Sequence, residues 1–368
     1  MGTKPTLSII VTTVRDDEHP YAGRPDLHLW DTLATTLAAQ QCRPGYFELI
    51  IVDGHWEQHG DWFAEHPQRY AVKHVPASPN AWHDIGASGA CAQLNRGIAW
   101  AEGTFLFFCH ENVMFPPHFV SQMLAMLDTG LIPIATYVED HGCCDDRSLD
   151  ECTVAPMPYD LLGYTGTKVH EDHRLRPILQ LPCATQVPWE HYFTFSTLPY
   201  ELALRINGWN ECMDGIGILT DCDVGSRIEM SGYGKLIVGH PDLWCVRAVP
   251  KLGHWSAKVR NDKKQYRCNY ALLLWHRWRH ETRAGALAHT GDGLLDEMEF
   301  NVCGQMCPLG AKCKAREVPD PYPFIYQRNP EIYREWRERV YDYDLASRVR
   351  DRRAGKPPFD RGFIHGPA

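Results

Sequence analysis

The sequence feature that most constrains the fold is the run Leu-Ser-Ile-Ile-Val-Thr-Thr at residues 7–13. The run is rich in β-branched residues and almost continuously apolar, which is typical of a strand covered on both faces in a parallel sheet. Apolar residues then recur at helical spacing over 30–38, and a second buried-strand pattern over 47–52 ends at Asp53. A strand, a helix and a strand in this order predict a parallel pair joined by a right-handed crossover.

The alternation continues to about residue 257. We expect further strands over 71–75, 104–108, 131–138 and 193–198, and further helices over 87–101, 117–127, 202–206 and 220–232. Residues 139–188 show little periodicity and are interpreted as a long loop or insertion. Beyond residue 258 the alternating pattern stops; we expect a helix over 270–278 and a charged helix over 330–352.

These patterns predict an α/β fold with a mostly parallel central sheet flanked by helices. We expect it to occupy residues 1–257, with one half over 1–130 and the other over 131–257. Residues 258–368 are predicted to form a mainly helical C-terminal extension.

Composition narrows the function classes. The formal charge of −9 over 368 residues argues against a general electrostatic grip on nucleic acid. The first apolar run, residues 7–11, is too short for a signal-peptide core or a membrane span. We therefore expect a soluble, cytoplasmic protein in which the 14 cysteines are mostly reduced thiols.

Polar residues replace apolar ones where the expected strands end. Thr12 and Thr13 close the first strand, Asp53 closes the second, and Cys109-His110-Glu111-Asn112 follows residue 108. In open α/β sheets, ligands bind at the carboxyl edge of the strands. The sequence therefore predicts a ligand site at that edge, although Asp53 before Gly54 also suits a simple turn.

A second acidic motif, Thr220-Asp221-Cys222-Asp223, opens the helix expected over 220–232. Thr220 and Asp223 have the spacing of a helix capping box, which explains Asp223 and leaves Asp221 available for chemistry. The segment Gly208-Trp209-Asn210-Glu211 lies shortly before this motif.

These landmarks, in this order, resemble glycosyltransferase family 2 with its GT-A fold, over roughly residues 5–256. The resemblance implies an inverting glycosyltransferase that moves a sugar from a nucleoside-diphosphate sugar, with a UDP-sugar favoured, to a hydroxyl of a glycan or other acceptor. It implies that Asp221 is the general base and that Asp53 contacts the nucleobase. The other implied donor-binding residues are Thr12, Thr13, Arg96, His110, Glu111 and Asn112, and the implied acceptor-binding residues are Trp209, Asp223 and Trp255.

The implied metal site departs from the family pattern. Where the family carries an Asp-x-Asp motif for Mg²⁺ or Mn²⁺, this sequence has His110-Glu111-Asn112, with His254 as a further ligand on the acceptor side. These cations prefer oxygen ligands, and Glu111 supplies the only charge of the motif. We expect weaker metal binding or altered metal selectivity, and the alternative is that these are polar loop residues.

The expected C-terminal extension carries three clustered thiols, Cys303, Cys307 and Cys313. They are candidates for a structural zinc site, with Cys268 or His289 as the fourth ligand. The alternative is a set of separate reduced thiols.

Two further functions stay open at this point. One is a nucleotide-sugar-binding or scaffold protein without turnover, which the absent Asp-x-Asp motif favours. The other is a glycosyltransferase acting on a modified nucleic-acid base, for which a basic stripe would come from Lys258, Arg260, Lys263, Lys264 and Arg267.

Overall fold

The structure is a computed structural model of the whole chain. It describes residues 5–13, 30–60, 62–78, 90–111, 113–140, 169–171, 185–186, 192, 195–211, 220–233, 237–248, 344–357 and 362–365.

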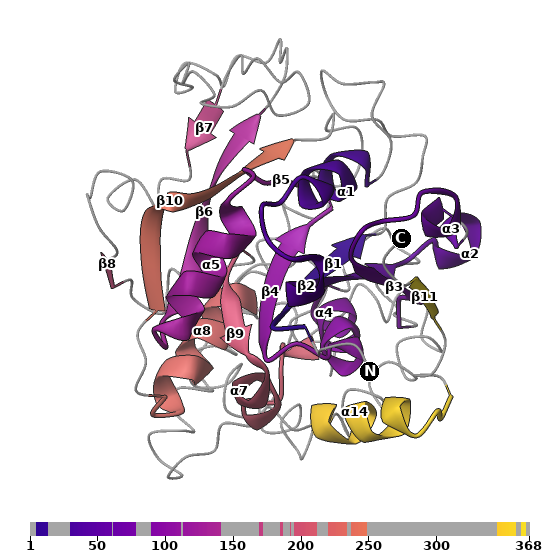
Figure 1. Cartoon of the computed structure of the whole chain (residues 1–368). Coiled ribbons are helices and arrows are strands. Elements are labelled where there is room, and N and C mark those ends of the chain that lie inside the picture. Colours follow the sequence, from indigo (N-terminus) through magenta and orange to yellow (C-terminus); the bar gives the residue numbers. More distant parts are fainter. Residues whose placement is uncertain are drawn as a thin grey trace, which may run out of the picture.

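A six-stranded sheet forms the centre of the described structure (Figure 1). Its strand order is β11-β3-β2-β1-β4-β9. The four inner strands are parallel, whereas the two edge strands, β9 and β11, are antiparallel to their neighbours. The strands are β1 (Leu7–Thr13), β2 (Phe47–Asp53), β3 (Ala71–Pro76), β4 (Phe105–His110), β9 (Thr197–Pro199) and β11 (Phe363–His365).

A second sheet adjoins the first beyond β9. Its order is β5-β10-β6-β7, with β8 also paired to β10. An isolated bridge between Ile134 and Ser196 connects it to the segment that leads into β9. The strands are β5 (Val113–Met114), β6 (Ile132–Asp140), β7 (Val169–Glu171), β8 (Thr185–Gln186) and β10 (Ile237–Ala248).

Helices cover both sheets. Helix α4 packs on β1 and β2, α14 packs on α4, and α5 packs on β6 and β10 (Figure 1). The helices are α1 (Asp31–Ala38), η1 (Pro44–Tyr46), α2 (Trp56–His59), α3 (Trp62–Glu65), α4 (Ala90–Trp100), α5 (Phe119–Asp128), α7 (Tyr200–Arg205), α8 (Thr220–Met230) and α14 (Leu345–Arg353). None of the helices in the described ranges is both long and apolar enough to cross a bilayer.

One part of the core lies between α4 and the central strands. Every residue of β2 is buried, and so is every residue of β1 except Thr12, which is partly exposed. A Cβ at Gly97 would lie 2.4 Å from Cγ2 of Ile10, so the glycine lets α4 approach β1 closely. Burying one large apolar side chain contributes about 1.5–3 kcal/mol, so the apolar side chains of this layer contribute strongly to the stability of the fold.

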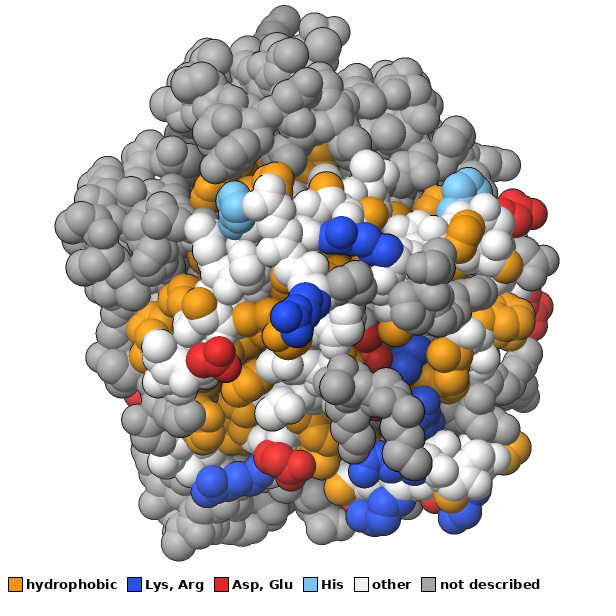
Figure 2. Space-filling view, viewed as in Figure 1, with side chains coloured by type: hydrophobic (Ala, Val, Ile, Leu, Met, Phe, Trp, Pro, Cys, Tyr) orange, Lys and Arg blue, Asp and Glu red, His pale blue; other side chains and the backbone are white. Residues whose placement is uncertain are grey.

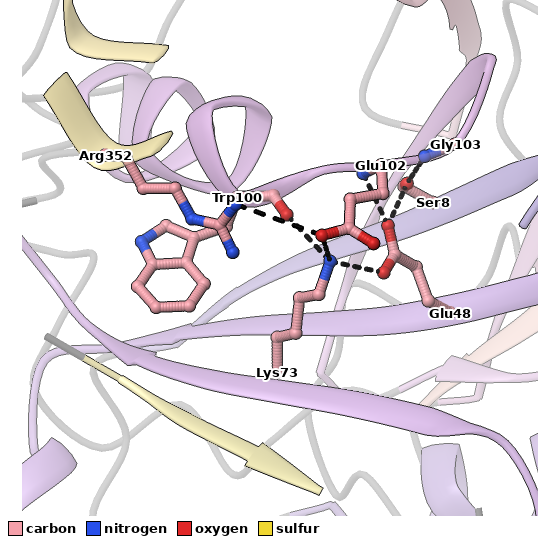
Figure 3. Close-up of polar contacts among 7 residues, drawn as sticks. All are labelled: Ser8, Glu48, Lys73, Trp100, Glu102, Gly103 and Arg352. Atoms are coloured by element: carbon pink, nitrogen blue, oxygen red, sulfur yellow. Dashed lines mark hydrogen bonds and ion pairs between the residues drawn. The ribbon is translucent and has the colours of Figure 1, made fainter. Parts of the chain in front are cut away.

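Buried polar residues lie at the amino edge of the central sheet, where its parallel strands begin (Figure 3). The Lys73 ammonium lies 2.7 Å from Oε2 of Glu48 and donates to the carbonyl of Trp100 at 3.0 Å. Ser8 donates to Oε1 of Glu48 at 2.6 Å. The Arg352 guanidinium of α14 lies 4.3 Å over the Trp100 ring, so α14 is attached to this edge. In the view of Figure 2, Lys and Arg side chains gather along the lower part of the face, near α14.

The predicted fold class is confirmed. The expected strands and helices up to residue 138 occur within three residues of their predicted bounds. Strands β5, β7, β8, β10 and β11 were not predicted, and β7 and β8 lie within the stretch 139–188 that was interpreted as a long loop or insertion. The described part of the expected extension contains α14 and also β11, a strand of the central sheet. Residues 258–343, which include the helix expected over 270–278 and most of the expected charged helix, lie outside the described ranges.

Candidate functional site at the carboxyl edge

The parallel register brings several of the predicted donor residues to one edge of the sheet. Thr13 pairs with Asp53, and Thr12 pairs with His110. Neighbouring strands lie about 4.8 Å apart, so these strand ends border one continuous surface. The sheet thus places Thr12, Thr13, Asp53 and His110 side by side, while their contact with a donor stays a prediction.

Asp53 is the most enclosed of these residues. Its side chain is 0% exposed. Oδ1 accepts a hydrogen bond from the backbone N–H of His55 at 2.8 Å, and Oδ2 lies 3.0 Å from Nδ1 of His59 and 3.0 Å from Nε2 of His74. Both carboxylate oxygens are therefore bonded within the protein.

Burial and hydrogen bonding have opposite effects on the pKa of the Asp53 carboxyl group. Burial raises the pKa of Asp53, but the hydrogen bonds from His59 and His74, the charge of His74 and the backbone N–H of His55 together hold the pKa below its ordinary value. Hydrogen bonds to the charged form of a carboxyl group favour ionisation. Asp53 is thus an ionised carboxylate inside the fold.

Aromatic rings pack against His59 and His74. The ring of Trp30 meets His74 edge-on at 5.0 Å and His59 at 5.6 Å, and Phe63 stacks on Trp30 at 5.2 Å. We name Asp53, His59 and His74 the aspartate–histidine cluster. Neither histidine was predicted from the sequence; the available signal was a polar Lys73-His74 pair inside an otherwise apolar strand.

The segment that replaces the Asp-x-Asp motif begins inside β4. His110 is the last residue of the strand, and its ring lies 5.4 Å from that of Phe195. His110 and Glu111 are each partly exposed, so both can meet a ligand. Asn112 lies outside the described residues.

Asp221 lies in the first turn of α8 and is partly exposed. Its Oδ1 accepts from the backbone N–H of Cys222 at 2.9 Å, which helps to orient the carboxylate. Burial and the charge of Asp221 together raise the pKa of Tyr192. The Tyr192 hydroxyl donates to the carbonyl of Thr197, the first residue of β9, at 3.1 Å.

Asp223 has a packing role in the fold. It is fully buried, and its Oδ2 accepts from Nε of Arg227 at 2.8 Å, one helical turn further on. Helix α8 begins at Thr220, and Asp223 is the acidic partner of Arg227 in a buried ion pair. The predicted contact between Asp223 and an acceptor stays a prediction.

The Gly208-Trp209 segment is also explained by packing. Trp209 is buried in the core, edge-on to Phe108 at 5.4 Å. Asn95 of α4 accepts from the Trp209 N–H at 2.8 Å and donates to its carbonyl at 2.7 Å. Gly208 has a φ of +64°, and a Cβ there would lie 2.3 Å from Oδ1 of Asn95, so only glycine suits this position. Asn95 was not singled out from the sequence.

The remaining predicted residues divide into two groups. Arg96 is described and is buried in α4. The predicted residues that lie outside the described ranges are Asn112, His254, Trp255, Cys303, Cys307 and Cys313, together with the basic stripe over 258–267.

Within the described part of the chain, no three His, Cys, Asp or Glu side chains are arranged to hold a metal ion. Two of the three predicted ligands of the divalent cation, Asn112 and His254, lie beyond that part. The divalent cation and the zinc site therefore stay predictions, and no step proposed below passes through a metal.

The fold and the edge define an α/β protein with a polar site at the carboxyl ends of parallel strands. No family model matches the sequence, and no curated protein matches it. Among solved structures, the chain is similar to residues 1–349 of S. aureus TarS in complex with UDP-GlcNAc, at 14% identity and a TM-score of 0.48, over 95% of this chain and 92% of that one. The chain spans 55% of the longer TarS structure.

Two other solved structures are similar to the chain. One is the mannosyltransferase PcManGT from Pyrobaculum calidifontis in complex with GDP-Man and Mn²⁺, at 14% identity and a TM-score of 0.43, over 94% of this chain and 87% of that one. The other is GalNAc-T7 with UDP, GalNAc and Mn²⁺, at 10% identity and a TM-score of 0.49, over 92% of this chain and 58% of that one. With scores below 0.5, these likenesses establish neither a family nor an activity.

Proposed function

We propose that the protein is an inverting glycosyltransferase that transfers a sugar from a nucleoside-diphosphate sugar to an acceptor hydroxyl. The observation that carries the proposal is the meeting of three polar strand ends at one edge of a parallel sheet, with Thr13 beside Asp53 and Thr12 beside His110. This is the edge at which α/β folds of this kind hold nucleotides. The order of these landmarks along the sequence is that of glycosyltransferase family 2.

In the proposed reaction Asp221 is the general base. It accepts the proton of the acceptor hydroxyl while the hydroxyl oxygen bonds to the anomeric carbon of the donor. The bond from that carbon to the diphosphate oxygen breaks on the opposite face, and its electron pair leaves with the diphosphate. The partly exposed carboxylate of Asp221, at the start of a helix and oriented by the Cys222 N–H, suits this task.

The test is the substitution Asp221→Asn. A positioned general base contributes about 10²–10⁴-fold to a rate, so kcat should fall by that factor while the dissociation constant of the donor changes little. Transfer is measured with a panel of UDP- and GDP-sugars, and donor binding by calorimetry. The matched control is Glu229→Gln, which makes the same carboxylate-to-amide change at an exposed position of α8 and should leave both values unchanged. Full turnover by the Asp221 variant would exclude this residue as the base.

One observation favours the second candidate, a nucleotide-sugar-binding protein without turnover. The Asp53 carboxylate faces inward, and the described part of the motif at 110–112 contains one carboxylate, that of Glu111. Such a protein binds nucleotide sugars and neither transfers nor hydrolyses them. Tight binding without sugar release across the whole donor panel would favour this candidate over the enzyme.

A further inference from the structure

The loop that follows β2 is held at both ends by a single buried carboxylate. Asp53 bonds through Oδ1 to the backbone of His55, where α2 begins, and through Oδ2 to the ring of His59, where α2 ends. The backbone of the same residue is also fixed, because its carbonyl accepts from the Ala77 N–H at 2.8 Å. Residues 54–59 therefore take their position from Asp53.

The carboxylate itself is closed off from the site. Its side chain is 0% exposed, and the rings of His59 and His74 lie on Oδ2, with Trp30 edge-on to both rings. A carboxylate oxygen has about two lone-pair directions, and the two imidazole nitrogens take both at Oδ2. A nucleobase that reached Oδ2 of Asp53 would have to displace buried rings, and Oδ1 is also enclosed and accepts the His55 N–H.

His55, in contrast, is partly exposed at the same edge of the sheet. It directly follows the Asp53-Gly54 pair, and the N–H of Gly54 donates to the carbonyl of Thr13 at 2.8 Å. The loop thus presents His55 next to the end of β1, where the proposed donor site lies. An imidazole ring can stack on a nucleobase or bond to it.

We propose that Asp53 is a positioning residue, which sets His55 and the 54–59 loop for the donor nucleotide and does not contact the nucleobase itself. This inference rests on the proposed donor site. It changes the role that the family resemblance implies for Asp53 from direct ligand to support. It also gives the buried His74, 21 residues away on β3, an effect on nucleotide binding.

The test compares variants of the cluster by nucleotide affinity. The dissociation constants of UDP and GDP are measured by calorimetry for the unchanged protein, Asp53→Asn, His74→Phe, His74→Gln and the double variant Asp53→Asn/His74→Phe. Asp53→Asn and His74→Phe should each weaken binding by about tenfold, because the first weakens the bonds that hold the loop and the second removes one of the bonds that fix the Asp53 carboxylate. The double variant should lose no more than the worse single variant, since both act through one cluster.

Two controls separate positioning from general destabilisation. His74→Gln keeps an N–H donor toward Asp53 and should restore most of the affinity lost in His74→Phe. His66→Phe replaces an exposed histidine just after α3 and should leave affinity unchanged. Amide exchange, measured without nucleotide, should be faster at residues 54–59 in Asp53→Asn and His74→Phe than in the unchanged protein.

Three outcomes would overturn the inference. If Asp53→Asn loses affinity while His74→Phe does not, and amide exchange at residues 54–59 is unchanged in both variants, Asp53 contacts the nucleotide directly. If both variants melt at lower temperature with unchanged affinity, the cluster is only structural. If the unchanged protein binds neither nucleotide, the proposed donor site is wrong, and so is the donor role of the loop. Faster amide exchange at residues 54–59 in the variants would then show that Asp53 positions the loop and that the failure lies in the proposed function.

Discussion

At the scale of single residues, Asp53 links the stability of the fold to pH. Its pKa in the folded protein is lower than the value of about 3.9 expected for an unfolded chain. A lowered folded-state pKa adds stability that is present above the unfolded pKa and is lost as the pH falls through the folded pKa. The relevant range therefore lies below about pH 4.

The first prediction here concerns Asp53→Asn and acid. At pH 7 the variant should have a lower free energy of unfolding than the unchanged protein, because it lacks the charged hydrogen bonds to the histidines. The difference should shrink as the pH is lowered below about 4, where Asp53 itself becomes protonated. Urea unfolding at a series of pH values measures it, and a constant difference across the series would contradict the argument.

A second residue-scale feature is the buried ion pair between Glu211 and Arg348. Nη1 of Arg348 lies 2.6 Å from Oε1 of Glu211, which is 0% exposed and also accepts from Asn95 at 3.1 Å. The pair connects the segment after α7 to α14. Removing one partner leaves the other charge buried without it.

We expect Arg348→Ala to lower the free energy of unfolding by about 3–5 kcal/mol. The matched control is Arg350→Ala, which removes an arginine that is 68% exposed and 3.6 Å from Asp344. That exposed contact is worth about 0–1 kcal/mol at most. Denaturant unfolding measures both, and equal effects of the two variants would show that the Glu211 contact contributes little.

The positions of some site residues could be predicted from the sequence, and those of others could not. Asp53, His110 and Asp221 follow from their positions at the ends of strands or the start of a helix, and the structure places all three there. The partners His59 and His74 do not follow, because their contact with Asp53 depends on how α2 and β3 pack. The same holds for Arg348, which is 137 residues from Glu211.

At the scale of elements, β11 completes one edge of the central sheet. It pairs antiparallel with β3, and its Phe363 stacks on Trp56 of α2 at 5.0 Å between ring centroids. A Cβ at Gly60 would lie 2.7 Å from the Phe363 ring, so the glycine makes room for it. Strand β11 thus supports α2, the helix that ends at His59.

We predict that Phe363→Ala loosens α2. The stacked pair is worth about 0.5–1.5 kcal/mol beyond the area it buries, so stability should fall by at least that amount. Amide exchange at residues 56–59 should become faster, while exchange in α5, which packs on the second sheet, should not change. Ile364→Ala is the control, since that side chain is 63% exposed.

Two of the unpredicted strands, β10 and β11, show where pattern reading fails. Strand β10 contains Gly239, His240, Pro241 and Asp242, and its register with β6 shifts between Gly239 and Trp244. Turn-forming residues in the middle of a strand hide the apolar pattern. Strand β11 has three residues, too few for any periodicity, and it forms only because β3 offers an edge.

At the scale of the whole molecule, residues 344–357 and 362–365 are part of the central α/β structure. Helix α14 packs on α4, the backbone N–H of Leu345 donates to Oδ1 of Asn207 at 2.8 Å, and Arg352 covers Trp100. The predicted boundary at residue 257 was drawn where the alternating pattern stops. Pattern alone does not reveal that a later segment returns to the first sheet.

Truncation tests this arrangement. A protein that ends after residue 343 lacks both α14 and β11, leaving Glu211 without Arg348 and β3 without its outer neighbour. We expect it to lose the cooperative thermal transition of the full chain or to melt at a lower temperature, as measured by circular dichroism. A protein that ends after residue 365 keeps both elements and should melt like the full chain. Equal melting of both truncated forms would show that the segment is dispensable.

The pairing of β11 with β3 also bears on synthesis. The two strands are separated by 286 intervening residues, from 77 to 362. At ribosomal rates of about 5–20 residues per second, β3 emerges roughly 14–57 s before its outer partner exists. During that interval the open edge of the nascent sheet is available to other chains, a hazard that unpaired strands carry generally. Chaperone demand during translation should therefore persist until the last strand has left the ribosome.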